Sequence, residues 1–200
     1  MNKIASIFYL MKQNIPTSDF YIIQKNNIEE QIMNNFYQTN LGWVVRCGRH
    51  PDSKDKPERG LPWNVCLSIE EIIDAVKAFY RDIPAEHYVF IHPQREMIKS
   101  GNLLIDGDKC IIEAVTGWPE GLSHGKESPQ AVYFFETPSL FVEPKKTEGN
   151  ENLLTPEEWY TLGKNIERKM NYSKLSLINP VIIEFSINNY GNVSAHDVQV

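Results

Sequence analysis

The sequence predicts an α+β fold whose strands form mixed or antiparallel sheets. Helical and strand patterns follow one another in the first half of the chain, and the second half is a run of strands, one helix and a closing pair of strands. The chain has 200 residues, of which 42% are hydrophobic and 11% aromatic. This content is enough for one substantial core or for two small lobes that share a cleft.

Four segments have the spacing or the start signals of helices. Apolar residues at offsets of three and four predict a helix over residues 3–13, and a second helix is expected over residues 28–37. Two more helices are expected to begin at the capping boxes Ser68-Ile69-Glu70-Glu71 and Thr155-Pro156-Glu157-Glu158. In a capping box, the side chains at both ends bond backbone N–H groups that the first helical turn leaves without partners.

Apolar runs and alternating patterns predict the strands. We expect strands over residues 20–23, 42–46, 87–91, 103–105, 110–115, 131–135, 140–142, 181–187 and 192–198. Residues 47–62 and 145–152 are polar, and the first of these segments is also rich in Gly and Pro, so both are expected to be loops. Gly107 and the segment Asn188-Asn189-Tyr190-Gly191 mark hairpin turns, and the last two strands should therefore pair.

Composition and charge exclude several classes of function. The formal net charge is −6, which argues against a general nucleic-acid binder because affinity for the phosphate backbone comes mainly from clustered Lys and Arg. No apolar run approaches the roughly 20 residues of a membrane-spanning helix. Three widely spaced cysteines, Cys47, Cys66 and Cys110, suit neither a disulfide framework nor a zinc site. We therefore expect a cytoplasmic protein that contacts neither nucleic acid nor a membrane.

Basic residues concentrate in one segment of this otherwise acidic chain: Arg46, Arg49, Lys54, Lys56 and Arg59. Arg46 ends an apolar strand at the start of this segment, where its planar guanidinium could bind a phosphate through two parallel hydrogen bonds. The cluster predicts a local anion site. A solvated charged loop, with Arg46 as a surface residue at a strand end, is the alternative reading.

Acidic residues within strands indicate a second kind of site. Alternation places Glu184 and Ser186 on one face of their strand, and the hairpin brings Asp197 close to Glu184. Two adjacent carboxylates repel unless a cation lies between them, and oxygen ligands suit Mg²⁺. Glu113 lies in another apolar strand, ahead of a turn in which Gly117 permits close backbone approach. In both cases the alternative is an acid that simply faces solvent.

These segments follow one another in an order that resembles a known family from end to end. The matching segments are Asn2-Lys3-Ile4-Ala5-Ser6, Asn14-Ile15-Pro16-Thr17-Ser18-Asp19-Phe20, Val45-Arg46-Cys47-Gly48, Asp52, Arg59-Gly60, Val65-Cys66-Leu67, Ser100-Gly101-Asn102, the series Glu113, Gly117, Glu120, Gly125 and Pro129, Ile183-Glu184-Phe185-Ser186, and His196-Asp197-Val198-Gln199-Val200. In this order they resemble the ATP-grasp half of the phosphoenolpyruvate synthase and pyruvate phosphate dikinase family. In that family the segment at residues 100–102 is a turn.

The resemblance implies a fold and a set of binding residues. The fold would be ATP-grasp-like, with residues 1–90 and 91–200 forming two lobes around a nucleotide cleft. Lys3 and Arg46 would be catalytic and hold the phosphates of ATP, and Glu184 and Asp197 would hold Mg²⁺. The other nucleotide-binding residues would be Arg49, His92, Gln94, Glu113 and Gly117, of which His92 and Gln94 would approach the adenine.

The chain also departs from the family pattern, and two hypotheses follow. The two serines after the family arginine are Cys47 and Gly48, Trp118 and Pro119 interrupt the glycine turn, and the family's phosphohistidine domain has no counterpart in the sequence. The first hypothesis is an ATP- and Mg²⁺-dependent phosphotransferase or ligase that acts on an unknown acceptor or partner protein. The second is a nucleotide-binding or regulatory subunit that does not turn over ATP.

Overall fold

The computed structural model describes residues 2–50, 52–53, 60–119, 122, 127–136, 143–171 and 179–200. Contacts within the chain divide it into two units: unit 1 comprises Met1–Ala5 and Ser18–Glu96, and unit 2 comprises Ser6–Thr17 and Met97–Val200. The sequence places the boundary between lobes near residue 90, whereas the boundary between these units lies after Glu96. The helix α1 (Lys3–Lys12) contributes residues to both units. Two lobes around a nucleotide cleft stay a prediction.

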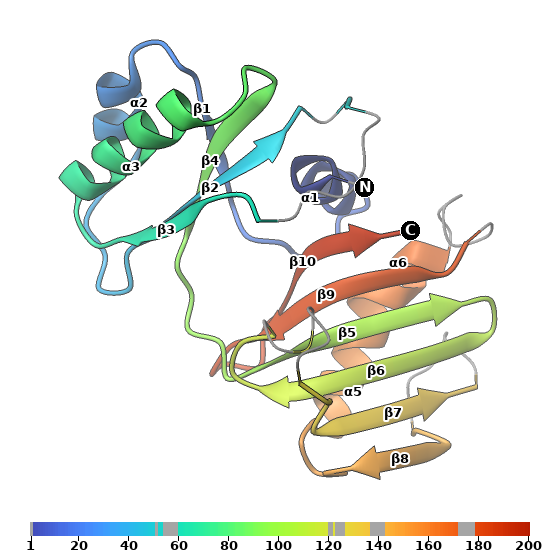
Figure 1. The fold of residues 1–200 in the computed structure, drawn as a ribbon. Helices are drawn as coiled ribbons and strands as arrows, with labels where there is room; N and C mark the ends of the chain where they lie inside the picture. The colour runs from blue at the N-terminus through green and yellow to red at the C-terminus, as the bar shows by residue number, and fades with distance from the viewer. Residues whose placement is uncertain are drawn as a thin grey trace. The chain divides into compact units, whose positions relative to one another are not determined.

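Unit 1 is built around a four-stranded antiparallel sheet (Figure 1). Its strands are β1 (Tyr21–Ile23), β2 (Trp43–Arg49), β3 (Trp63–Cys66) and β4 (His87–Pro93), in the order β1-β4-β2-β3. The helices α2 (Ile28–Asn35) and α3 (Ile69–Asp82) pack together, and their buried side chains form one core with one face of the sheet.

The expected helix start at Ser68 is confirmed, with one difference in its hydrogen bonds. The Ser68 hydroxyl accepts a hydrogen bond from the N–H of Glu71, as a capping residue should. The Glu71 carboxylate, however, accepts the N–H of Leu67 at 2.6 Å. This bond fixes the chain between β3 and α3, so the strand and the helix are held together at the helix N-terminus.

Unit 2 contains a six-stranded antiparallel sheet in the order β10-β9-β5-β6-β7-β8. The strands are β5 (Lys99–Asp106), β6 (Lys109–Thr116), β7 (Ala131–Phe135), β8 (Lys146–Gly149), β9 (Val181–Ile187) and β10 (Val193–Gln199). The helix α5 (Pro156–Leu162) continues through a π-helical turn, Gly163–Glu167, into α6 (Arg168–Asn171). Figure 1 shows α5 and α6 behind this sheet, and their apolar side chains share one core with the strand residues of that face.

Most of the predicted elements that fall on described residues are present, and three features differ from the prediction. The strand β2 continues through Cys47 and Gly48 to Arg49, because these residues pair with the first residues of β4. The strand β8 lies in a segment that is expected to be a loop, and β3 lies in a segment for which the sequence predicts no element. Ser100-Gly101-Asn102 is not a turn but part of β5. The strand expected over residues 140–142 lies outside the described residues.

Gly101 explains why that segment forms a strand. A Cβ at this position would lie 1.9 Å from the carbonyl oxygen of Glu113 and 2.9 Å from the ring of Phe185. No real Cβ fits at such distances, so only a glycine here permits β5 and β6 to approach this closely. The sequence pattern around Gly101 does not show this close approach.

In the part of the chain that the structure describes, no helix is long and apolar enough to cross a membrane.

Candidate functional site

Arg46 lies in the middle of the unit 1 sheet. It pairs with Phe90 on β4 and with Trp63 on β3, so all three side chains share one face of the sheet. The neighbouring residues Val45 and Cys47 point to the opposite face, where they are buried in the core with α2 and α3. The face that carries Arg46 is therefore the one opposite α2 and α3, and Arg46 is half-buried there.

His92 pairs with Val44, two residues before Arg46, and so lies on the same face of the sheet. Nearby positive charges affect the pKa of its imidazole. Its pKa is lowered to about 4, chiefly by burial and also by the positive charges of Arg46, Lys3 and Arg95, against a hydrogen bond to the Pro93 carbonyl that raises it. The imidazole is thus neutral at pH 7 and lies within electrostatic range of three cations. We call Lys3, Arg46 and Arg95 the cationic group. A local concentration of positive charge favours an anionic ligand.

The pKa of His92 makes a testable contribution to stability. A histidine whose pKa is depressed in the folded chain stabilises the fold fully above 6.5, and this contribution is lost as pH falls from 6.5 to about 4. In the parent chain, His92 should lower the unfolding free energy by about 3 kcal/mol between pH 6.5 and about 4, and the variant His92→Gln should lack this part of the decrease. Denaturant unfolding at a series of pH values measures the slope. His50→Gln is the control, since the His50 side chain is 48% exposed; equal slopes for parent and His92→Gln would contradict the assignment.

Arg49 and Gln94 differ from Arg46 in what surrounds them. Arg49 is three residues beyond Arg46 on β2 and pairs with His87, so strand alternation puts it on the other face, and the structure does not bring it together with the cationic group. Gln94 follows β4, and its backbone N–H donates to the carbonyl of Gly42. Its side-chain Oε1 is buried and has no hydrogen-bond partner among the described residues. A buried acceptor of this kind needs a donor, and a bound ligand can supply one.

Arg95 is the residue of this group that sequence patterns missed. It follows Gln94 directly and lies in no motif, so its role appears only through its electrostatic effect on His92. The remaining basic residues of the predicted anion loop, Lys54, Lys56 and Arg59, lie outside the described residues.

In unit 2, a polar row runs sideways across the sheet. Asp197 on β10 pairs with Glu184 on β9, Glu184 pairs with Asn102 on β5, and Asn102 pairs with Glu113 on β6. Laterally paired residues share a face, and this face is opposite the one that packs on α5 and α6. We call these four residues the acidic row. All four side chains are partly exposed.

Neighbouring amides hydrogen-bond the carboxylates of the acidic row. The amide of Asn102 donates to Glu113 Oε2 at 3.4 Å, and the amide of Gln199 donates to Glu184 Oε1 at 3.4 Å. The Asp197 Oδ1 accepts the N–H of Val198 at 2.9 Å. Asn102 is a second residue whose place sequence patterns missed, because the strand was expected to begin at Leu103.

The pairing of Glu184 with Asp197 depends on a β-bulge. Regular pairing from the turn onwards would put His196, not Asp197, opposite Glu184, but the register shifts between Ala195 and Asp197. The bulge also lets the His196 ring reach Ser186, with 2.5 Å between Nε2 and the hydroxyl. Bulges re-aim side chains in this way beside functional sites. Sequence alternation predicted the proximity of the two acids but not the irregularity that produces it.

The donor set of the acidic row fits Mg²⁺. Its oxygens come from three carboxylates and one amide, and two of the carboxylates, Glu184 and Asp197, lie on adjacent strands. Such oxygens are the hard ligands that Mg²⁺ prefers. The described residues contain no group of three or more His, Cys, Asp or Glu side chains placed to hold a metal by themselves. Since Mg²⁺ usually keeps waters or substrate phosphates in its coordination shell, two carboxylates are sufficient anchors for it.

Gly117 follows the strand β6 directly and has a positive φ of 72°, which explains why glycine stands there. Its N–H donates to the carbonyl of Ile98, and its carbonyl accepts the Ser100 hydroxyl, so the turn is tied to β5. A role for Gly117 in nucleotide binding stays a prediction. The next motif residues, Glu120 and Gly125, lie outside the described residues.

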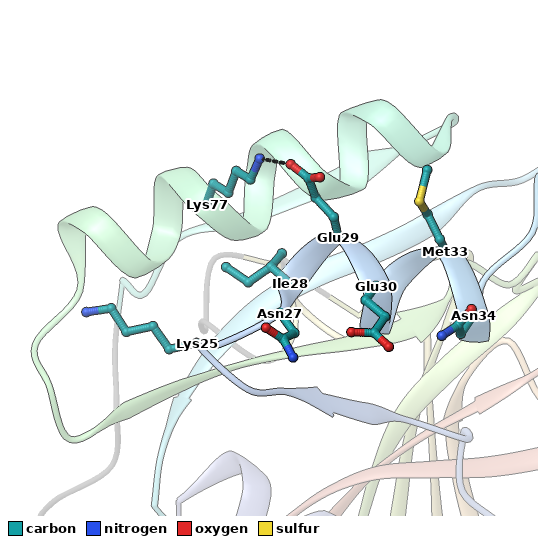
Figure 2. Close-up of a pocket in the computed structure, with 8 residues that line it drawn as sticks. All are labelled: Lys25, Asn27, Ile28, Glu29, Glu30, Met33, Asn34 and Lys77. Atoms are coloured by element: carbon teal, nitrogen blue, oxygen red, sulfur yellow. Dashed lines mark hydrogen bonds and ion pairs between the residues drawn. The ribbon is translucent and has the colours of Figure 1, made fainter.

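A surface hollow of about 640 Å³ in unit 1 contains none of the predicted site residues (Figure 2). It lies over α2 and is lined by Lys25, Asn27, Ile28, Glu29, Glu30, Met33, Asn34 and Lys77. Figure 2 shows Glu29 of α2 and Lys77 of α3 joined by an ion pair. The ammonium nitrogen lies 2.5 Å from the carboxylate oxygen. The hollow is wide open and bordered by exposed side chains. It carries no part of the predicted chemistry.

The fold is shared with enzymes of known structure. A D-alanine–D-alanine ligase from Helicobacter pylori matches with a TM-score of 0.59 and 15% identity over 99% of this chain and 53% of that one. The ADP complex of an N5-carboxyaminoimidazole ribonucleotide synthetase matches with a TM-score of 0.60 and 10% identity over 99% and 44%. A synthetase of the same name from Thermotoga maritima matches with 0.55 and 9% over 99% and 41%.

These likenesses establish the fold and no more, because the identities are low and this chain spans about half the length of those proteins or less. No family model matches the sequence, and no curated protein is similar enough to count as a relative. The matched proteins are ATP-grasp enzymes, and both sheets of this chain are antiparallel with helices on one face. The chain therefore has an α+β fold of the ATP-grasp type.

Proposed function

We propose that this chain binds ATP with Mg²⁺ and performs ATP-dependent ligase or phosphotransferase chemistry. The observation that carries the proposal is the acidic row, in which Glu184 and Asp197 pair across adjacent strands of an ATP-grasp fold. The likeness to the phosphoenolpyruvate synthase family rests on sequence alone. On the basis of this likeness, the more specific proposal is that the chain transfers a phosphoryl group to an acceptor or a partner protein.

Each group of residues would have its own task. The cationic group would bind phosphate oxygens, and Gln94 Oε1 would accept a hydrogen bond from the adenine amino group. Glu184 and Asp197 would hold Mg²⁺, with the Asn102 amide beside them. Bound Mg²⁺ neutralises charge on the phosphates, which is most of what phosphoryl transfer asks of a protein. Lys3 and Arg46 would stabilise the same charge through hydrogen bonds that stay in place during the reaction.

A specific observation favours a second candidate, a nucleotide-binding subunit without turnover. Where the resembling family has two serines, Cys47 is buried against the helices of unit 1. A Cβ on Gly48 would lie 3.0 Å from Ile4, so packing occupies the space that a serine side chain would need. Both hydroxyls are thus replaced by structural residues, and any catalysis must proceed without them.

An assay of ATP turnover separates these candidates. The chain is incubated with ATP and Mg²⁺, and the nucleotide products are resolved by chromatography. Release of ADP supports a ligase or kinase, and release of AMP supports chemistry like that of the dikinases. Binding of ATP without either product supports the subunit without turnover. If ATP does not bind at all, both candidates are wrong.

Arg46→Lys tests the phosphate-binding role of the arginine. Lysine keeps the charge but loses the planar fork, so we expect nucleotide affinity to fall by about 1.5–3 kcal/mol, which is tenfold or more. Arg49→Lys is the matched control on the same strand and should leave affinity unchanged. Calorimetric titration measures both. An unchanged affinity for Arg46→Lys together with a loss for Arg49→Lys would mean that the phosphate site has been placed on the wrong face of β2.

A further inference from the structure

The bulge in β10 brings two consecutive side chains to the polar face of the unit 2 sheet. The register shifts between Ala195 and Asp197, so His196 is the extra residue that the bulge inserts. In a regular strand, His196 and Asp197 would point to opposite faces. Here Asp197 pairs with Glu184. The His196 ring forms a hydrogen bond with Ser186, which is two residues from Glu184 on β9 and so shares its face. The ring therefore lies on the same face as both candidate Mg²⁺ ligands.

The hydrogen bond between Ser186 and His196 joins a buried residue to a more exposed one. Ser186 is only 4% exposed, whereas His196 is partly exposed. The Ser186 hydroxyl lies 2.5 Å from His196 Nε2. Because a hydroxyl both donates and accepts, Ser186 is compatible with either tautomer of the imidazole, and the group next to Nδ1 decides which one forms. A ligand oxygen next to Nδ1 would select the tautomer with its proton on Nδ1, and Ser186 would then donate to Nε2.

The two strands that carry the candidate Mg²⁺ ligands contain no cationic Lys or Arg side chain: β9 reads VIIEFSI and β10 reads VSAHDVQ. The amide of Gln199 donates to Glu184. Phosphates bound to Mg²⁺ at Glu184 and Asp197 would lie over this face, and their charged oxygens need hydrogen-bond donors as well as the metal. His196 can supply such a donor from β10, and a hydrogen bond to an ionised phosphate is one of the strong kind.

We propose that His196 donates a hydrogen bond from Nδ1 to a phosphate oxygen of Mg²⁺-bound ATP, and that Ser186 is the positioning residue that fixes the ring. The inference rests on the proposed ATP site and adds a phosphate-contacting residue to it. Ser186 does not touch the nucleotide and acts only through the imidazole. The bulge then has a function, because it places a metal ligand and a phosphate donor at consecutive positions on one face.

Calorimetric titration with ATP and Mg²⁺ tests both roles. His196→Phe keeps a planar ring without N–H groups, so affinity should fall about tenfold or more, as expected for a lost hydrogen bond to a charged group. His196→Gln keeps a side-chain donor and should bind ATP more tightly than His196→Phe. Ser186→Ala should weaken binding about two- to tenfold, the effect of one neutral hydrogen bond. Ser186→Thr restores a hydroxyl and should recover the affinity of the parent.

Nuclear magnetic resonance of the ring nitrogens gives a second readout, which a purely structural role would not change. Histidine is labelled with a heavy nitrogen isotope, and the signals of His196 are identified by their absence in His196→Gln. Saturation with ATP and Mg²⁺ should shift the His196 ring to the tautomer that is protonated at Nδ1. His196 signals that do not change on saturation would contradict the proposed contact.

Tyr133→Phe is the control for loss of a buried hydroxyl. The Tyr133 hydroxyl accepts the N–H of Leu154 at 2.8 Å in the core of unit 2, so this variant should unfold at a lower temperature and bind ATP as the parent does. If the parent binds ATP and His196→Phe binds it equally well, the inference is wrong and the proposed ATP site stands. If Ser186→Ala loses only stability without ligand, the pair is structural. If the parent does not bind ATP, the proposed function fails, and the inference fails with it.

Discussion

Replacing Glu184 by Gln is expected to weaken Mg²⁺-dependent ATP binding about 100-fold or more. Loss of a residue that only hydrogen-bonds a metal ligand lowers metal affinity about 10–100-fold, and loss of a ligand itself should have at least the larger effect. Glutamine keeps the shape of the side chain and removes the charge that would hold the metal. The ligand-free chain should be as stable as the parent or slightly more stable. Glu184 faces Asp197 on the neighbouring strand, and the substitution relieves repulsion between like charges.

Calorimetric titration with ATP and Mg²⁺ measures the loss, and thermal unfolding of the ligand-free chain measures stability. Glu148→Gln is the matched control. Glu148 stands at the far end of the same lateral line of paired residues, on the edge strand β8, and forms an ion pair with Lys146. It should bind ATP as the parent does. If Glu184→Gln instead lowers the unfolding temperature strongly and leaves ATP binding intact, Glu184 is a structural residue.

Glu158→Gln is expected to destabilise the chain by about 3 kcal/mol, the lower end of the range for breaking a buried ion pair. Both oxygens of Glu158 accept the Lys99 ammonium, at 2.9 and 2.8 Å, and the two side chains are only 9% and 18% exposed. Glutamine can still complete the capping box with Thr155, so the substitution removes the charge and keeps the helix cap. A loss of this size corresponds to roughly 6–12 °C in unfolding temperature for a chain of this length.

Thermal and denaturant unfolding check this expectation, with Glu157→Gln as the control in the same helical turn. A double variant, Lys99→Met with Glu158→Leu, should recover most of the stability, because an apolar pair replaces a buried ion pair with little loss. If Glu158→Gln is as stable as the parent, the pair contributes nothing. If the double variant is less stable than the single one, shape rather than charge determines stability at this position.

The helices and the last hairpin could be predicted because their signals are local. Offsets of three and four, capping boxes and the Asn-rich turn before Gly191 act within a few residues, and the structure contains the corresponding elements. Alternation also placed Glu184 on the polar face of its strand correctly. The face of the sheet that carries the acidic row follows from the same period of two.

The features that could not be predicted depend on residues far apart in the sequence. Lys99 and Glu158 are 59 residues apart and belong to no common motif. The sequence predicts a turn at Gly101, whereas the structure shows a strand there, in which the Glu113 carbonyl leaves no room for a side chain. The bulge at His196 sets the register of the two acids, and no local pattern marks it. Arg95 joins the cationic group through tertiary structure alone.

The central claim is that this chain binds ATP together with Mg²⁺. Titration of the parent chain with ATP, once with excess Mg²⁺ and once with a chelator, tests it most directly. We predict saturable binding with Mg²⁺ and binding at least tenfold weaker with the chelator, because metal-free ATP leaves Glu184 and Asp197 facing uncompensated phosphate charge. Equal binding under the two conditions would contradict a metal role for the acidic row, and no binding under either would contradict the claim itself.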